Sequence, residues 1–172
     1  RLRRIPQGRT AALLLVGDPA VHDKLRDAFL HPTRTRLERL GASMVATEAV
    51  TEDEASVAKA VSRLVGMADL LIIAGQTSVM DENDTTLRAL RRAGAEMTLS
   101  GAPVEPGNLL ALAYFPQVPV VCAPGCARGL RRNVMELVLP RLLVGERLER
   151  ADMAALALGG FLTKAERAGD TT

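Results

Sequence analysis

The stretch that decides the fold is DLLIIAGQTSVMDENDTTLRAL, residues 69–90. It begins with a short apolar run at residues 70–74, which predicts a strand buried on both faces. Gly75 ends the run, and three small or polar residues follow it: Gln76, Thr77 and Ser78. From Asp84 onward the spacing of apolar residues predicts a helix. A buried strand that delivers a small polar loop to a helix is typical of an α/β sheet.

Strand and helix patterns alternate on both sides of this stretch. Apolar runs predict further strands beginning at residue 10 and covering residues 42–50, 96–100, 109–114 and 118–123. Helical spacing predicts helices over residues 21–40, from residue 51, and from residue 124, and Phe115-Pro116-Gln117 predicts a hairpin turn. This alternation favours a three-layer αβα sandwich with a mostly parallel sheet.

Three local signals predict where helices begin or end. Pro32 lacks an N–H donor and disfavours helix at the residue before it, so we expect it to interrupt the first helix. Thr51 and Glu54 have the spacing of a capping box, which predicts the start of the second helix. Pro140 predicts that the last helix of the sheet region ends or kinks.

Composition bounds the function classes. The 172 residues predict one domain, and 22 basic against 20 acidic side chains give too small an excess for a nucleic-acid surface. No apolar run approaches the roughly 20 residues of a membrane helix. Cys122 and Cys126 are the only cysteines, too few for a zinc site, and they favour a reducing, cytoplasmic compartment. The chain opens without Met, which predicts that it is an interior piece of a longer protein.

Two loops are candidates for a ligand site, because ligands bind beyond the carboxyl ends of strands in open α/β sheets. The first is Gly75 to Ser78, and the second runs from Pro124 to Arg128, as Pro124-Gly125-Cys126-Ala127-Arg128. Each has a glycine that lets backbone N–H groups approach a ligand, and each precedes a predicted helix start that favours an anion. The hydroxyls of the first loop and the Arg128 guanidinium would add contacts. Ordinary strand-to-helix turns are the alternative interpretation.

The carboxylates and arginines also allow two interpretations, one as ligand-binding residues and one as purely structural residues. Asp53 and Asp84 precede predicted helices, where they would hold Mg²⁺ beside a phosphate or simply cap the helix. Arginines form two clusters, at residues 88–92 and 128–132, which would attract a phosphorylated ligand or form solvated helix faces. Cys126 is a candidate reactive thiol or a packed loop residue.

These residues resemble a known family. DLLIIAGQTSVMDENDTT, GAPVEPGNLLAL and VVCAPGCARGL are similar, in this order, to the three ligand loops of the molybdenum-cofactor-biosynthesis (molybdopterin-binding) domain, over residues 10–145. The resemblance implies that Pro106, Gly107 and Asn108 join the two loops above in a site for molybdopterin or the molybdenum cofactor. Gln76 stands where the family has a second glycine, Asn108 where it has lysine, and Cys126-Ala127 where it has Asn-Pro. These residues resemble a divergent branch that is often fused to a nucleotidyltransferase-like domain.

The resemblance implies three possible functions. The first is binding of a phosphorylated pterin during molybdenum cofactor biosynthesis, and the second is a transferase that uses Mg²⁺ and a nucleotide at Asp53 and Asp84. The third is a degenerate domain kept as a scaffold or for oligomerisation. The resemblance further implies a homo-oligomer. It also divides the chain into a leader at residues 1–9, the binding domain at residues 10–145, and a terminal helix and frayed tail at residues 146–172 before a further domain.

Overall fold

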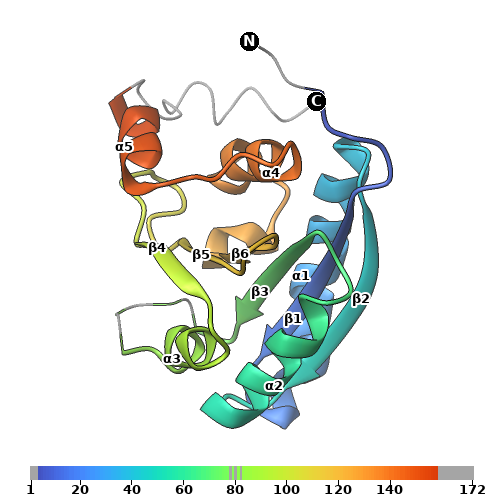
Figure 1. Cartoon of the computed structure of the whole chain (residues 1–172). Helices are drawn as coiled ribbons and strands as arrows, with labels where there is room; N and C mark the ends of the chain where they lie inside the picture. Colours follow the sequence, from blue (N-terminus) through green and yellow to red (C-terminus); the bar gives the residue numbers. More distant parts are fainter. Residues whose placement is uncertain (1–3, 78, 80, 82, 159–172) are drawn as a thin grey trace.

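A single sheet organises the part of the chain that the structure, a computed structural model, describes: residues 4–77, 79, 81 and 83–158. Its strand order is β2-β1-β3-β6-β5-β4 (Figure 1). The strands are β1 (Thr10–Val16), β2 (Ser43–Val50), β3 (Leu70–Gly75), β4 (Glu96–Ser100), β5 (Ala111–Tyr114) and β6 (Pro119–Cys122). Each of them overlaps one of the predicted runs, and β3 continues one residue beyond its run, through Gly75.

Strand direction determines which loops meet. The pairs β1–β2, β1–β3 and β3–β6 are parallel, whereas β5 is antiparallel to both β4 and β6. Strand β4 therefore runs in the same direction as β3 and β6. The predicted hairpin turn joins β5 to β6, with Phe115 and Val118 exchanging backbone hydrogen bonds of 3.0 and 3.3 Å. The mostly parallel sheet is confirmed.

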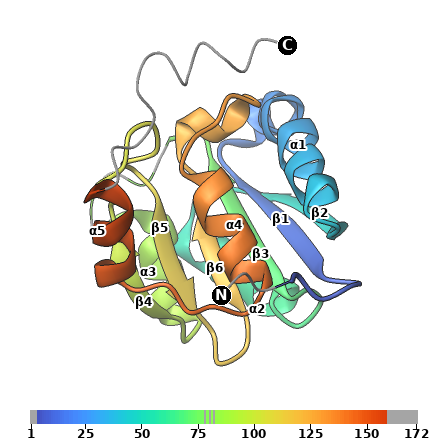
Figure 2. The same ribbon diagram turned by 90° about the horizontal axis from the view of Figure 1, so that it is seen from above.

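Helices cover both faces of the sheet, because successive side chains of a strand point to opposite sides. Leu13 and Ile72 belong to one core with helices α1 (His22–Arg39), α4 (Met135–Leu143) and α5 (Arg150–Leu158). Leu14 and Ile73 belong to the other core with α2 (Glu54–Leu64) and α3 (Thr85–Arg92). Figure 2 shows α1 and α4 side by side over the same face. The three-layer αβα sandwich is confirmed.

Pro32 does not interrupt its helix, so that prediction was wrong, and Pro140 does not end its helix, which leaves the kink as the predicted alternative there. Helix α1 continues through Pro32, and α4 continues through Pro140 to Leu143. A proline removes one hydrogen bond and crowds the preceding turn. In α1 the flanking residues Phe29 and Leu37 are fully buried against the sheet. Tertiary packing on both sides of Pro32 therefore holds the helix together, as packing often overrides local propensity.

Two predicted helix starts also need correction. Helix α2 is capped by Asp53, not Thr51: the Asp53 carboxylate accepts from the Ser56 N–H at 2.8 Å, and the Thr51 hydroxyl donates to the same carboxylate at 2.6 Å. The carboxylate lies nearer the helix start and is the stronger acceptor. After β6, residues Gly125–Arg128 form only a 3-10 turn (η2), and α4 begins at Met135. Residues 129–134 separate η2 from α4, and this loop has its own hydrogen-bond partners.

Candidate functional site

Three loops meet at one edge of the sheet. Because β3, β6 and β4 run in the same direction, the segments after Gly75, Cys122 and Ser100 all leave from that edge. The Arg128 Nη2 donates to the Gln76 carbonyl at 3.1 Å, which joins the first loop to the second. Val134, on the segment between the second loop and α4, donates its N–H to the Pro106 carbonyl at 3.1 Å, which joins that segment to the third loop. The three predicted loops are therefore brought together.

The loop after β3 is open to solvent. The Gln76 N–H donates to the Val16 carbonyl at 2.9 Å, and the Gln76 side-chain oxygen accepts from the Asp18 N–H at 3.3 Å. A Cβ on Gly75 would lie 2.6 Å from the Thr77 carbonyl oxygen, so the loop closes only around a glycine. Gln76 and Thr77 are exposed. Ser78, which the sequence predicts as a ligand residue, lies outside the described residues.

The loop after β4 is packed rather than open. Gly107 is buried with a φ of 128°, and a Cβ there would overlap the Val134 side chain. The Asn108 carbonyl accepts from the Ala102 N–H at 2.8 Å, while the Asn108 residue as a whole is exposed. Pro106 and Gly107 therefore support the loop after β6, and Asn108 is the predicted binding residue of this segment that faces solvent.

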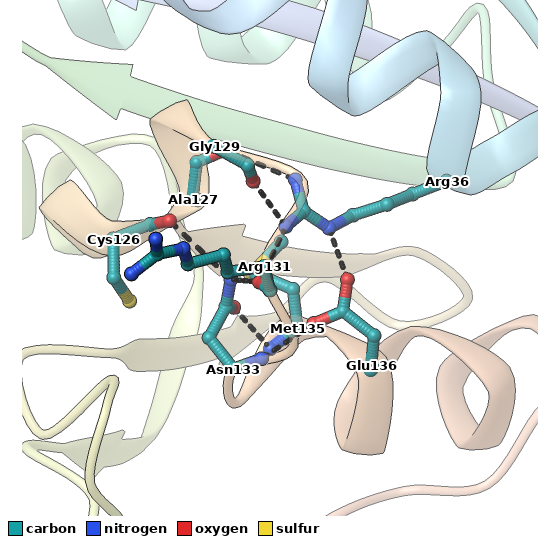
Figure 3. A network of polar contacts seen from close by, with 8 residues as sticks. All are labelled: Arg36, Cys126, Ala127, Gly129, Arg131, Asn133, Met135 and Glu136. Atoms are coloured by element: carbon teal, nitrogen blue, oxygen red, sulfur yellow. Dashed lines mark hydrogen bonds and ion pairs between the residues drawn. The ribbon is translucent and has the colours of Figure 1, made fainter. Parts of the chain in front are cut away.

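Arg36 of α1 contacts the loop after β6 from its buried side. The Arg36 side chain is 4% exposed. The Arg36 guanidinium donates to the carbonyl oxygens of Ala127 (3.0 Å), Gly129 (2.6 Å) and Arg131 (3.5 Å) (Figure 3). Its Nε donates to a Glu136 carboxylate oxygen at 2.5 Å. One buried cation therefore fixes the path of the chain from η2 to α4.

Asn133 completes this network and is 1% exposed. Its side-chain amide donates to the carbonyls of Arg131 (2.9 Å) and Cys126 (3.3 Å), and its Oδ1 accepts from the Met135 N–H at 2.9 Å. The second Glu136 oxygen accepts from the Asn133 N–H at 2.8 Å. Asn133 and Glu136 thus satisfy the first turn of α4 in the reciprocal manner of a capping box.

Sequence reasoning missed Arg36, Asn133 and Glu136, although signals for them exist. Asn133 precedes Glu136 by three residues, which is capping-box spacing. Arg36 continues the buried helical stripe of Leu25, Phe29 and Pro32, at steps of four, three and four residues. A charged residue on the buried stripe of a helix predicts a buried partner, because an isolated charge in a core is very unfavourable.

Arg128 lies beside a pocket at the start of α1. Its guanidinium carbon is 5.2 Å from the centre of the buried Phe29 ring, a cation–π distance. A pocket of about 200 Å³ is lined by Val21, Lys24, Leu25, Ala28, Gln76 and Arg128. Two cations therefore border a partly apolar pocket next to the loop after β3. Among the described residues no carboxylate pairs with Arg128.

Both predicted metal-binding carboxylates are helix caps. The Asp84 carboxylate accepts from the Thr86 N–H at 2.8 Å, at the start of α3. Hydrogen bonds from Ser56 and Thr51 lower the pKa of Asp53, which is fully exposed, to about 2. No cluster of three or more His, Cys, Asp or Glu suited to a metal occurs among the described residues. The capping role is observed, and a magnesium role for the pair stays a prediction.

The cysteines differ in burial, but neither is poised as a thiolate. Burial raises the pKa of Cys122 to about 12, with a smaller contribution from the charge of Asp84. Burial also raises the pKa of the half-buried Cys126. A reactive cysteine needs a lowered pKa, so the packed interpretation of Cys126 is the better supported one.

The two arginine clusters have different partners. On α3, Arg88 and Arg92 pair with Glu54 of α2 at 3.3 and 3.4 Å. After η2, Arg131 and Arg132 are exposed, and within the described part of the chain no carboxylate pairs with either side chain. As far as the structure describes the chain, the second cluster keeps positive charge beside the three loops that no carboxylate pairs.

The fold and the converging loops define an αβα domain in which three loops gather at the carboxyl ends of β3, β4 and β6. The chain belongs to the family described as "Probable molybdopterin binding domain", which matches residues 12–144. No described helix has the length and apolar character needed to cross a bilayer.

Solved structures share this fold at low sequence identity. The molybdopterin biosynthesis MoeA protein of Pyrococcus horikosii is 19% identical with a TM-score of 0.60, over 79% of this chain and 35% of that one. The CinA protein of Thermoplasma acidophilum is 11% identical with a TM-score of 0.61, over 78% and 98%. The molybdopterin biosynthesis enzyme MoaB of Thermus thermophilus is 18% identical with a TM-score of 0.56, over 80% and 98%.

One curated relative is similar in sequence. A probable FAD synthase of Caenorhabditis elegans is 29% identical over 87 residues, which are 51% of this chain. The chain spans only 17% of the length of that relative.

Proposed function

We propose that this domain binds molybdopterin or the molybdenum cofactor at the edge where the three loops meet, during biosynthesis or maturation of that cofactor. The observation that carries the proposal is the joining of the predicted loops by the Arg128–Gln76 and Val134–Pro106 hydrogen bonds in a chain that belongs to this family. The ligand would be cargo that the domain holds and passes on.

The residues at this edge fit a ligand with a phosphate group. A Cβ on Gly75 would lie 2.6 Å from the Thr77 carbonyl oxygen, so the loop needs glycine to fold back over the end of β3. Arg128 and Lys24 bring positive charge to a pocket whose other walls include Val21, Leu25 and Ala28. Cations of this kind attract an anionic ligand, and apolar side chains can pack against the face of a ring, so the pocket fits an anionic ligand that contains a ring system.

Titration of the purified chain with molybdopterin under anaerobic conditions tests the proposal. We expect Arg128→Gln to weaken binding roughly 10- to 150-fold, because a hydrogen bond to a charged group contributes about 1.5–3 kcal/mol. Arg92→Gln on α3 is the matched control, and it removes the same charge at a position paired with Glu54. Ser78→Ala tests the sequence-based part of the site. Equal affinity of Arg128→Gln and wild type would place the site elsewhere.

A second candidate function is a Mg²⁺-dependent transferase acting on molybdopterin with a nucleotide. The similarity to a probable FAD synthase and the carboxylates of Asp53 and Asp84 favour it. Asp84→Asn separates the two functions, since Asn caps a helix as well as Asp but is a poorer ligand for a hard cation. If the chain turns over ATP or CTP only with Mg²⁺ and Asp84→Asn abolishes turnover, the transferase is correct. Binding without turnover selects the first function.

We also propose two assembly features for the whole protein. The similarity to part of a probable FAD synthase supports a fused nucleotidyltransferase-like domain. A homo-oligomer in the cytoplasm follows from the family resemblance. Light scattering of the purified chain that shows only monomer would count against the oligomer. A third function, a scaffold that binds no ligand, would be selected if molybdopterin fails to bind.

A further inference from the structure

Three carbonyl oxygens after β6, those of Ala127, Gly129 and Arg131, are turned to one side of the chain. Arg36 binds those of Ala127 and Gly129, and both Arg36 and Asn133 bind that of Arg131. Both partners are buried under the loop (Figure 3). Carbonyls at residues 127, 129 and 131 therefore point into the protein.

The geometry of the peptide bond fixes what the other side presents. In a trans peptide the N–H points away from the C=O of the same unit. The N–H groups of Leu130 and Arg132, which share peptide units with the carbonyls of Gly129 and Arg131, therefore point outward. Within the described residues neither N–H has a hydrogen-bond acceptor, and both residues are exposed. These two N–H groups are therefore donors that remain available to solvent or to a bound anion.

The charges around the turn favour an anion as well. Glu136 compensates the positive charge of Arg36, so this charge stabilises the loop and adds no positive charge to the surface. Arg131 and Arg132 keep their charge, and Figure 3 shows the Arg131 side chain extending back from the turn toward Cys126. Glu105 is the acidic residue whose charge reaches Cys126 from the loop after β4. Two arginines against one glutamate leave the turn basic.

We propose that the turn Gly129–Arg132 binds a phosphate group, through the N–H groups of Leu130 and Arg132 and the guanidinium groups of Arg131 and Arg132. The ligand class is a phosphate monoester or a diphosphate. This inference rests on the proposed function for the identity of the natural ligand, and it places that ligand's phosphate beyond η2 rather than on the loop after β3. Arg36 is a positioning residue for this site, because it acts through the backbone.

Titration of the ¹⁵N-labelled chain with inorganic pyrophosphate tests the turn directly. We expect saturable shifts, with the amide signals of Leu130 and Arg132 among those that move most. The double variant Arg131→Gln/Arg132→Gln should bind pyrophosphate roughly 10-fold or more weakly, since it loses two charged donors. The control Arg88→Gln/Arg92→Gln removes the same charge from α3 and should change affinity less than about twofold, as expected for arginines already paired with Glu54.

The outcomes separate this inference from the proposed function. Unmoved signals of Leu130 and Arg132, or equal losses in the two double variants, would overturn the phosphate site. If molybdopterin binds equally well to wild type and to the Arg131→Gln/Arg132→Gln variant, the turn is not the phosphate site although the proposed function stands. If pyrophosphate shifts both signals and molybdopterin does not bind at all, the site stands and the proposed function fails.

Discussion

The loops after β3 and β6 each follow a buried strand and contain a glycine, yet they are held in different ways. Both start with a small residue at the end of a buried strand and carry polar side chains beyond it. The loop after β3 is held to its neighbour β1 by the Gln76–Val16 bond and by a side-chain contact to Asp18. The loop after β6 is tied to the buried Arg36 and Asn133 through five carbonyl contacts.

This difference identifies which residues determine the conformation of each loop. Local turn chemistry shapes the loop after β3, because Gly75 alone permits its closure. A residue 91 positions earlier in the chain shapes the loop after β6, since Arg36 reaches Ala127. One loop therefore depends on its own sequence, and the other depends on a distant helix. Arg36→Met with its control Arg39→Met, and Gly75→Ala, test this contrast, starting with the substitution that should have the largest effect.

Arg36→Met should destabilise the fold most. It removes a buried cation, leaves the Glu136 carboxylate without its ion-pair partner, and leaves the carbonyls of Ala127 and Gly129 without their donor. Breaking a buried pair in this way costs about 3–5 kcal/mol. At roughly 2–4 °C per kcal/mol for a chain of this size, the Tm should fall by about 6–20 °C. Urea denaturation and calorimetry measure both quantities.

Arg39→Met is the matched control for this prediction. Arg39 is exposed on the same helix, and the described residues offer it no carboxylate partner. Its loss should change the free energy of unfolding by no more than about 0.5 kcal/mol, as for other surface substitutions. Similar losses in the two variants would mean that Arg36 does not hold the loop after β6.

Gly75→Ala should affect stability less and ligand binding more. The new Cβ would meet the Thr77 carbonyl oxygen at 2.6 Å, so the loop must move. Overpacking of this size costs about 1–3 kcal/mol, and an exposed loop should relax toward the lower value. We expect a small loss by urea denaturation together with a clear loss of molybdopterin affinity. A variant that binds as wild type would show that the loop after β3 is not part of the site.

Much of the fold was predictable because its strands are buried and apolar. Runs such as residues 70–74 left no alternative to a buried strand, and the parallel order then brought the three loops to one edge. The path after η2 was not predictable, because Arg36 and Ala127 are distant in sequence and their contact is tertiary. Pro32 failed as a signal for the same reason, since packing of Phe29 and Leu37 outweighs it.

Loss of the Asp53 cap should lower stability less than the substitutions above, and the loss should depend on pH. Asp53 has a pKa of about 2 in the folded chain against an ordinary value of 3.8, owing to hydrogen bonds from Ser56 and Thr51. A lowered folded pKa stabilises the protein fully above the unfolded pKa, and that contribution is lost as the pH falls through the folded pKa. The urea midpoint of Asp53→Ala should therefore lie below wild type at pH 7, and the two midpoints should converge between about pH 4 and pH 2. A gap that stays constant with pH would contradict this charge-dependent cap.

The smallest expected effect concerns the two cysteines, which lie at the end of β6 and in the loop that follows. Burial raises the pKa of Cys122 to about 12 and also raises that of the half-buried Cys126. Only the thiolate reacts with iodoacetamide. At pH 8 we expect Cys126 to be alkylated first, more slowly than in urea, and Cys122 to react only when the chain unfolds. Arg36→Met should bring the Cys126 rate several-fold closer to the rate in urea, because the loop loses its anchor, whereas Arg39→Met should not. Mass spectrometry of tryptic peptides measures each site separately. If Arg36→Met leaves the Cys126 rate unchanged, the loop after β6 keeps its conformation without the buried arginine, and the contrast between the two loops fails.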